Sequence, residues 1–343
     1  DADTAKLFLD DGHWPLAGEW TALTEQHLDQ RAFAATLRQI AEYGADCFYR
    51  GDVARALVAD VREKGGCLSL EDLAAYQAEI VDPLVVAHRG GRVWVTPGLT
   101  GGPTFGRALE QLSRELSPSA GVPGAGTYSA FARSLDAAFR ARLESMGDHE
   151  SPKAPGSTTH FSVVDRHGNM CAVTQTLLSI FGSKVVSPST GLLLNNGVMW
   201  FDPEPGKPNS LAPGKRCLAN YCPVIGEDAA GRRFALGASG GRKILGAVLQ
   251  LSSFIMDHGL NLEQAFHQPR IDVSGGGKII ADRLLSAEVI GALEAVAPVT
   301  TARRNVYPYA FACPAGVMRE GDMNTGCTEI MTPYGDAIAE RTA

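Results

Sequence analysis

Residues 156–176 read GSTTHFSVVDRHGNMCAVTQT and carry the strongest structural pattern in the chain. Two apolar, β-branched runs flank the turn residues 165–169, which predicts a β-hairpin over 158–176. The residues before it, 148–157 (DHESPKAPGS), are polar, contain two prolines and show no periodicity, as is typical of a linker. We therefore divide the chain into a portion 1–157 and a portion 158–343.

The portion before the linker is predicted to be mainly helical, because apolar residues recur at helical spacing. Gly44 is typical of a helix end, and Ser69 is typical of a helix start. The predicted helices span about 33–43, 53–64, 70–75, 104–115 and 128–146, with a strand pair at 84–87 and 92–96. After the hairpin, short strands are predicted at 191–194 and 234–237, and helices at 243–257, 262–267 and 287–296. This order indicates a mixed fold in which helices cover a sandwich of sheets.

Composition narrows the classes of function. The chain has 343 residues, 45% of them hydrophobic, with 31 Lys and Arg against 38 Asp and Glu. A net charge of −7 without a basic stripe argues against a nucleic-acid partner. No apolar run is long enough to span a bilayer, and the histidines lack metal-ligand spacing. We expect no membrane span, no metal and no cofactor.

The seven cysteines are scattered and odd in number, without a C-x-x-C pair. This pattern predicts mostly buried free thiols in a reducing compartment, so we expect a cytoplasmic protein. A removed upstream signal would instead point to the periplasm.

Thr158 stands where the exposed linker meets the first strand. A threonine hydroxyl is a poor nucleophile unless a base stands beside it. If the Ser157–Thr158 bond is cut, the new α-amino group of Thr158 has a pKa near neutrality and can take the hydroxyl proton. Taken alone, a Ser-Thr-Thr run at a strand start is also an ordinary structural feature.

Two further segments could complete such a site. Thr176 faces Thr158 across the predicted hairpin, although a β-branched residue is equally at home in any strand. Gly240 and Gly241 begin a helix and could offer backbone N–H groups to an oxyanion. The other interpretation of the glycine pair is a plain strand-to-helix turn.

Together these segments resemble the γ-glutamyltranspeptidase family in order and spacing. The resemblance rests on Thr158 to Asp165 (TTHFSVVD), Gly191 to Asn196, Pro213 to Arg216 and Gly240-Gly241, with Gly66 to Tyr76 upstream. It implies an N-terminal-nucleophile hydrolase with an α+β, four-layer αββα sandwich. It also implies a precursor cut at Ser157–Thr158 into a large-subunit portion ending at 157 and a small subunit 158–343, with an upstream part of the large subunit absent from this chain.

The resemblance also implies roles for individual residues. Thr158 would be the nucleophile and its own base, Thr176 its partner, and Gly240 and Gly241 the oxyanion donors. Asn195 and Asn196 match a family pair near the substrate, a small-molecule amide. Their alternative is a turn that bonds its own backbone.

The departures from the family pattern cluster at the amino-acid end of the pocket. Gly197 to Trp200 replaces Gln-Met-Asp-Asp, Ala219-Asn220 replaces two serines, and Leu178 replaces an asparagine. Each swap removes a polar partner of a γ-glutamyl group. Losing one charge-assisted hydrogen bond would weaken substrate binding by about 2–3 kcal/mol. Trp200 instead offers an apolar face to an acyl or aromatic group, with Asn220 beside the pocket.

Three functions therefore stay open. The first is a self-processing threonine hydrolase or acyltransferase that cleaves a γ-glutamyl-type or related amide as a heterodimer or higher oligomer. The second is a divergent member, an acylase or carbon–carbon hydrolase of secondary metabolism. The third is an unprocessed, inactive scaffold.

Overall fold

The computed structural model describes residues 1–9, 28–146, 156–274, 276–305, 310–331 and 335–340. Most of the predicted linker lies outside these residues. The described chain forms two compact units, one of residues 1–80 and 181–196, the other of 81–180 and 197–343. These units do not follow the division at 157/158, which concerns a cleavage point and stays a prediction.

The smaller unit is helical. Its helices are α1 (Ala2–Phe8), α2 (Arg31–Tyr43), α3 (Asp46–Tyr49), α4 (Asp52–Glu63) and α5 (Leu70–Ala75). The Asp60 carboxylate of α4 is buried and accepts hydrogen bonds from the Ser189 backbone N–H at 2.9 Å, the Ser189 hydroxyl at 2.8 Å and the Ser187 hydroxyl. These bonds attach α4 to the segment 187–190.

The strand predicted at 191–194 is wrong. The structure has only an isolated bridge there, between Val186 and Leu193. Gly191 adopts a φ of +69° and packs against the backbone of Phe33, where an added Cβ would lie 2.4 Å from the Phe33 nitrogen. The segment turns around α2 instead of extending, because Gly191 allows the left-handed conformation.

The larger unit is built on an antiparallel sheet of six strands in the order β1-β2-β5-β6-β10-β11. These strands are β1 (Leu84–His88), β2 (Gly91–Val95), β5 (Val224–Glu227), β6 (Arg233–Ser239), β10 (Cys313–Glu320) and β11 (Met323–Thr328). A small sheet of β7 (Ile271–Asp272), β8 (Ile279–Asp282) and β9 (Val299–Ala302) includes one parallel pair, β8 with β9.

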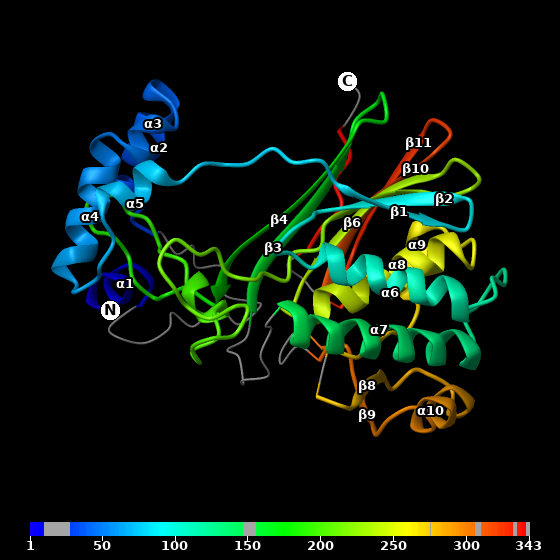
Figure 1. Cartoon of the computed structure of the whole chain (residues 1–343). Coiled ribbons are helices and arrows are strands. Elements are labelled where there is room, and N and C mark those ends of the chain that lie inside the picture. The colour runs from blue at the N-terminus through cyan, green and yellow to red at the C-terminus, as the bar shows by residue number, and fades with distance from the viewer. Residues whose placement is uncertain (10–27, 147–155, 275, 306–309, 332–334, 341–343) are drawn as a thin grey trace. The chain divides into compact units, whose positions relative to one another are not determined.

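Helices cover one face of the six-stranded sheet. Helices α6 (Gly102–Glu115) and α8 (Lys243–Met256) pack on it, and α7 (Ala125–Met146) packs on α6 (Figure 1). Residues 244–255 of α8 are all buried, as expected of a helix that is apolar on every side. In the helix predicted at 128–146, Phe131, Leu135 and Phe139 are buried in the same core, while Leu143, the next residue at the same spacing, is half-buried.

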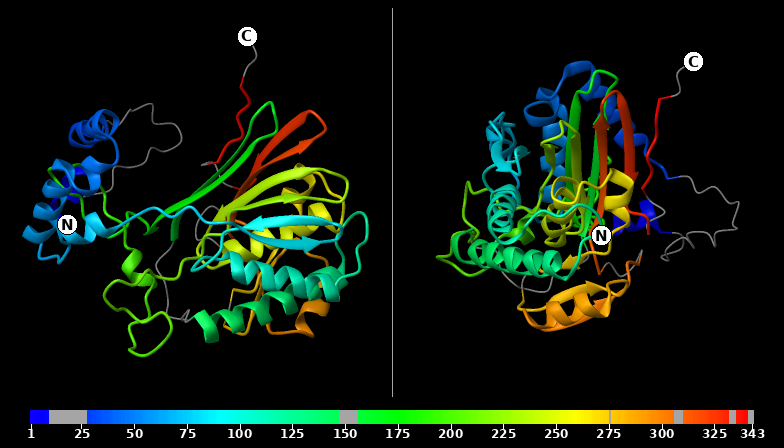
Figure 2. Two further views of the ribbon diagram at one scale, coloured as in Figure 1. Left: turned by 45° about the horizontal axis from the view of Figure 1, so that its top comes forward. Right: turned by 90° about the vertical axis from the view of Figure 1, so that its right-hand side faces the viewer.

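The other face of the six-stranded sheet receives the hairpin of β3 (Gly156–Val164) and β4 (Met170–Ser179), which packs on β6 and β10 (Figure 2). The unit also contains α9 (Leu262–His267), α10 (Ala287–Glu294) and the 3-10 turn η1 (Gly197–Trp200). The fold is therefore mixed α and β with mainly antiparallel sheets, and the predicted hairpin is confirmed. None of the described helices has the length and apolar character that crossing a membrane requires.

The cysteines correct one expectation. All seven are free thiols, but only Cys222 is buried, while Cys67 and Cys171 are exposed. The prediction of mostly buried thiols is wrong, because four of the others are half-buried and Cys171 lies in β4 of a two-stranded hairpin.

Candidate active site

The register of the hairpin brings the two threonines together. Thr158 pairs directly with Thr176, and the register is irregular between Gly156 and Thr158. The Oγ1 atoms of Thr158 and Thr176 lie 3.1 Å apart, within hydrogen-bond distance. Since paired residues of an antiparallel ladder share one face, both hydroxyls belong to the same side of the hairpin.

The Thr176 hydroxyl has a second contact that orders the end of β4. It accepts a hydrogen bond from the backbone N–H of Leu178 at 2.8 Å. Leu178 is buried and has a φ of +76°, a conformation that costs energy for a residue with a Cβ. The hydroxyl therefore stabilises a strained turn and is fixed in front of Thr158.

His160 lies on the same face, two residues after Thr158. Its ring nitrogens lie 2.8 Å from the Thr174 Oγ1 atom and 3.0 Å from the Ser162 Oγ atom. Burial lowers the pKa of His160 to about 4, although a backbone hydrogen bond at Val173 acts in the opposite direction. The ring is therefore neutral near pH 7, donating one hydrogen bond and accepting the other.

Two contacts fix the direction of the hairpin on β6. At the turn, a Cβ on Gly168 would lie 2.4 Å from the Arg233 guanidinium, at the start of β6. Farther along, the His160 ring touches Gly237, near the end of β6. Thr158 precedes His160 by two strand residues, about 7 Å, so it lies toward Ser239 and the turn that follows.

That turn contains Gly240 and Gly241. Their φ angles are +137° and +63°, which glycine adopts readily. A Cβ on Gly240 would lie 2.9 Å from the Cα of Ala312, so the backbones approach closely there. The turn leads directly into α8, whose N-terminus favours negative charge. The roles given to Thr158, Thr176, Gly240 and Gly241 remain predictions.

Asn209, which the sequence did not single out, joins two segments predicted to bind substrate, the one with Trp200 and the one with Asn220. We call these two segments the specificity region. The Asn209 side chain donates a hydrogen bond to the Trp200 carbonyl at 2.6 Å and accepts one from the Leu218 N–H at 3.0 Å. Asn209 is buried and Trp200 is half-buried. Thus η1 and the segment leading to Ala219-Asn220, which both depart from the family pattern, form one connected region.

Asn220 is itself buried, with 6% of its surface exposed. Its Oδ1 atom accepts a hydrogen bond from Arg142 at 2.8 Å, while Arg142 also donates to the carbonyls of Ala219 and Thr100 at 2.8 and 3.0 Å. The Asn220 Nδ2 atom is buried without a hydrogen-bond partner. Arg142 gave no signal in the sequence, because it is one of several arginines in a long helix.

The remaining predicted residues lie elsewhere. Asn195 is exposed and Asn196 half-buried, and both belong to the smaller unit, so they are described separately from Thr158. Within that unit, the Leu194 carbonyl preceding Asn195 accepts a hydrogen bond from the Ser183 N–H at 2.9 Å. The side chain of Ser157, at the predicted cleavage point, lies outside the described features.

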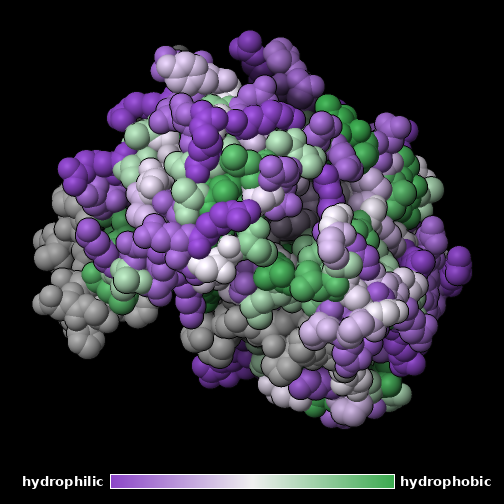
Figure 3. Space-filling view, turned by 60° about the vertical axis from the view of Figure 1, so that its left-hand side comes forward, coloured by the Kyte–Doolittle hydropathy of each residue, from purple (hydrophilic) through white to green (hydrophobic). Residues whose placement is uncertain are grey.

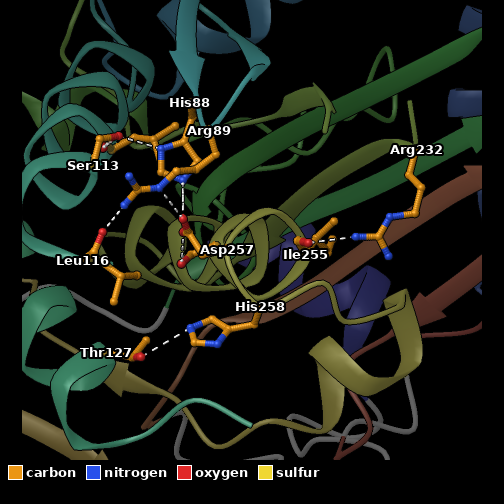
Figure 4. A network of polar contacts seen from close by, with 11 residues as sticks. His88, Arg89, Ser113, Leu116, Thr127, Arg232, Ile255, Asp257 and His258 are labelled. Atoms are coloured by element: carbon orange, nitrogen blue, oxygen red, sulfur yellow. Dashed lines mark hydrogen bonds and ion pairs between the residues drawn. The ribbon is translucent and has the colours of Figure 1, made fainter. Parts of the chain in front are cut away.

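A Ser-His-Asp arrangement occurs away from these residues (Figure 4). The His88 ring lies 2.6 Å from the Ser113 Oγ atom and 3.0 Å from both Asp257 carboxylate oxygens. The Ser113 hydroxyl also lies 2.9 Å from the carbonyl of Leu109 on its own helix, and Arg89 binds Asp257 at 2.9 Å. This buried network joins β1, α6 and the end of α8, so we interpret it as structural.

A buried carboxylate lies in β7, which packs against α8. Asp272 in β7 is 6% exposed, and burial raises its pKa to about 6, against opposing effects of Lys243 and the Ser274 hydroxyl. The Ser274 hydroxyl donates to Asp272 at 3.0 Å. Ionising this carboxyl therefore costs folding free energy.

Comparisons with known proteins place the chain in a family. A family model for gamma-glutamyltranspeptidase matches residues 1–157 and 151–329. The acylase ACY 1 proenzyme of Pseudomonas sp. (strain SE83) is 30% identical over 284 residues, covering 73% of this chain and 51% of that protein. The glutathione hydrolase proenzyme of Escherichia coli (strain K12) is 30% identical over 292 residues, covering 71% and 50%.

The fold has relatives among solved structures. Cephalosporin acylase from Bacillus halodurans superposes with a TM-score of 0.80 at 24% identity, covering 96% of this chain and 65% of that chain. This likeness concerns the fold alone. The chain spans about half the length of the two relatives described above. With the family model matching both the helical portion and the hairpin portion, the chain belongs to the gamma-glutamyltranspeptidase family.

Proposed function

We propose that the protein is a self-processing threonine hydrolase or acyltransferase that cleaves an amide through an acyl-enzyme on Thr158. The observation that carries the proposal is the pair of hydroxyls, Thr158 and Thr176, 3.1 Å apart where the hairpin begins. A nucleophile needs such a partner to lose its proton and to keep its orientation.

The first step is cleavage of the chain. The Thr158 hydroxyl attacks the Ser157 carbonyl carbon, the C–N bond breaks and the Thr158 nitrogen becomes an amine, leaving an ester that water hydrolyses. The products are the portions 1–157 and 158–343, which remain together as a heterodimer. The names of both relatives described above include the word proenzyme, in agreement with a processed product.

The second step uses the new amine. It takes the proton of the Thr158 hydroxyl as the oxygen attacks the substrate amide, and general-base assistance of this kind is worth about 10²–10⁴ in rate. The N–H groups of Gly240 and Gly241 bind the oxyanion. The substrate's amine leaves with the proton that the Thr158 amine had taken, and water or an acceptor amine then releases the acyl group from the Thr158 oxygen.

The substrate class is a second part of the proposal. A non-glutamyl acyl amide fits this chain better than glutathione, because Asn220 is engaged with buried Arg142 and Trp200 stands in the connected specificity region. A charged amino-acid end would lack the partners that the family pattern supplies. The relatives support both versions, since one is named an acylase and the other a glutathione hydrolase.

For the whole protein we propose the four-layer αββα sandwich. The described order of hairpin, six-stranded sheet and helices supplies three of the layers. Alternation along β3 turns Phe161 and Val163 away from the sheet, and these residues are 45% and 51% exposed. Hydrophobic patches are visible on one face of the molecule in Figure 3. A covering helical layer from the rest of a longer protein would bury the outer side of the hairpin.

Intact mass under denaturing conditions tests the processing step. The full-length protein should give two chains that meet at Ser157–Thr158, and Thr158→Ala should give one. A single mass for the wild-type protein would refute the proposal and favour the scaffold alternative.

Turnover tests the substrate class. The cleaved protein should hydrolyse an aliphatic or aromatic acyl amide faster than γ-glutamyl p-nitroanilide. Ordinary turnover of glutathione would refute the non-glutamyl version while leaving the threonine mechanism intact.

A further inference from the structure

After Arg233, the face of β6 that meets the hairpin is made of small residues. Phe234 and Leu236 point into the helical core, so alternation turns Ala235, Gly237 and Ser239 toward β3 and β4. The hairpin can therefore approach this strand closely.

The space beside Gly237 is filled by the ring of His160. A Cβ added to Gly237 would lie 2.2, 2.3 and 2.7 Å from the Cε1, Nδ1 and Nε2 atoms of that ring, and these are its three nearest neighbours. Real Cβ atoms essentially never come so close. The His160 ring thus occupies the space that a side chain at position 237 would fill. We call this contact between His160 and Gly237 the interlock.

The ring has little freedom to move aside. Thr174 Oγ1 and Ser162 Oγ hold its two nitrogens at 2.8 and 3.0 Å, one from each strand of the hairpin. A shift of the ring therefore breaks a hydrogen bond in a half-buried site, which costs more than an exposed bond would.

Both parts of the proposed site lie next to the interlock, on the same side of it. Thr158 is two residues before His160 on β3. Gly240 is three residues after Gly237, in the turn that follows β6. Sliding β3 along β6 would move the Thr158 hydroxyl relative to the glycine turn. A displacement of about 1 Å from a productive geometry can cost on the order of 10²-fold in rate.

We propose that His160 is a positioning residue, whose ring seated on Gly237 sets the distance between the Thr158 hydroxyl and the Gly240-Gly241 turn. This inference rests on the proposed threonine mechanism. It assigns His160 no proton transfer and no contact with substrate.

A double-mutant cycle in the full-length precursor tests the inference. The variants are Gly237→Ala, His160→Ala and the two combined, measured for the rate of self-cleavage and for kcat and KM on an acyl amide. Gly226→Ala is the matched control, because its Cβ would lie 2.1 Å from the Phe234 ring on the opposite, helical side of the sheet.

Gly237→Ala should slow self-cleavage at least tenfold and lower kcat with little change in KM, because the interlock does not touch substrate. Gly226→Ala should lower the melting temperature without that loss of rate. In the His160→Ala background, adding Gly237→Ala should change the rates less than threefold, since the ring it collides with is gone.

Other outcomes overturn the inference in distinguishable ways. If Gly237→Ala cleaves and turns over like the Gly226→Ala control, the interlock does not position the site, while the threonine mechanism stands. An equal effect of Gly237→Ala with and without His160 refutes the pairing. If Gly237→Ala alone does not fold, the combined variant decides, and its failure to fold also refutes the pairing. A wild-type protein that is neither cut nor active removes the proposed function and this inference with it.

Discussion

Replacing His160 by glutamine should remove a large part of the acid sensitivity of the protein. The folded state holds the imidazole neutral, with a pKa of about 4 against an ordinary value of 6.5, because the half-buried ring loses much of its hydration. Below pH 6.5 the unfolded chain binds a proton that the folded chain does not, so stability falls as the pH falls toward 4. At 1.36 kcal/mol per pH unit, the loss is about 2 kcal/mol at pH 5 and about 3 kcal/mol at pH 4.

The measurement is the free energy of unfolding by urea between pH 4 and pH 7.5 for the Thr158→Ala protein, which stays in one piece, with and without His160→Gln. The difference between the two should shrink by about 2 kcal/mol from pH 7.5 to pH 5. His167→Gln, at the exposed turn of the same hairpin, is the comparison variant, because it removes a histidine without changing the ring at Gly237. Parallel profiles for all three proteins would refute the assignment of a half-buried, neutral ring to the folded state.

Three further predictions concern other buried polar groups. Thr176→Val should lower the free energy of unfolding by about 1–3 kcal/mol, because it removes the acceptor of the Leu178 N–H, and it should slow self-cleavage. Thr176→Ser should do neither, and equal cleavage rates of the two variants in a mass-spectrometric time course would contradict this. Asp272→Asn should stabilise the protein increasingly from pH 4 to pH 7, by up to about 3 kcal/mol, because the carboxyl with a raised pKa loses stability as it ionises; a flat difference in urea unfolding would exclude it. His88→Ala should cost about 3 kcal/mol by breaking the buried pair with Asp257 yet leave the cleavage rate within threefold, and abolished cleavage in a folded variant would show that the network does more than hold the fold.

The elements near the candidate site follow from local sequence. Alternation and turn residues predict the hairpin, and its register alone brings Thr158 opposite Thr176. The glycine pair before an apolar helix likewise predicts the strand-to-helix turn of Gly240 and Gly241. Such features depend on periods of two and on backbone conformations, which short stretches of sequence record.

The contacts that shape the specificity region could not be predicted in this way. Asn209 reaches Trp200 and Leu218 across nine residues on each side, and Arg142 reaches Asn220 across 78 residues. Nothing in the local pattern around either residue distinguishes it from a surface polar side chain. Their partners are set by how distant segments pack, which no periodicity encodes.

The amide of Asn209 binds two main-chain atoms, the Trp200 carbonyl and the Leu218 N–H. Neither bond depends on which side chains stand at 197–200 or 218–220. Side chains in these two segments can therefore be replaced while Asn209 keeps the path of the backbone. A few substitutions at 197–200 and 218–220 could therefore change a surface that binds a glutamyl group into one that binds another acyl group. The hairpin with the proposed nucleophile would not change.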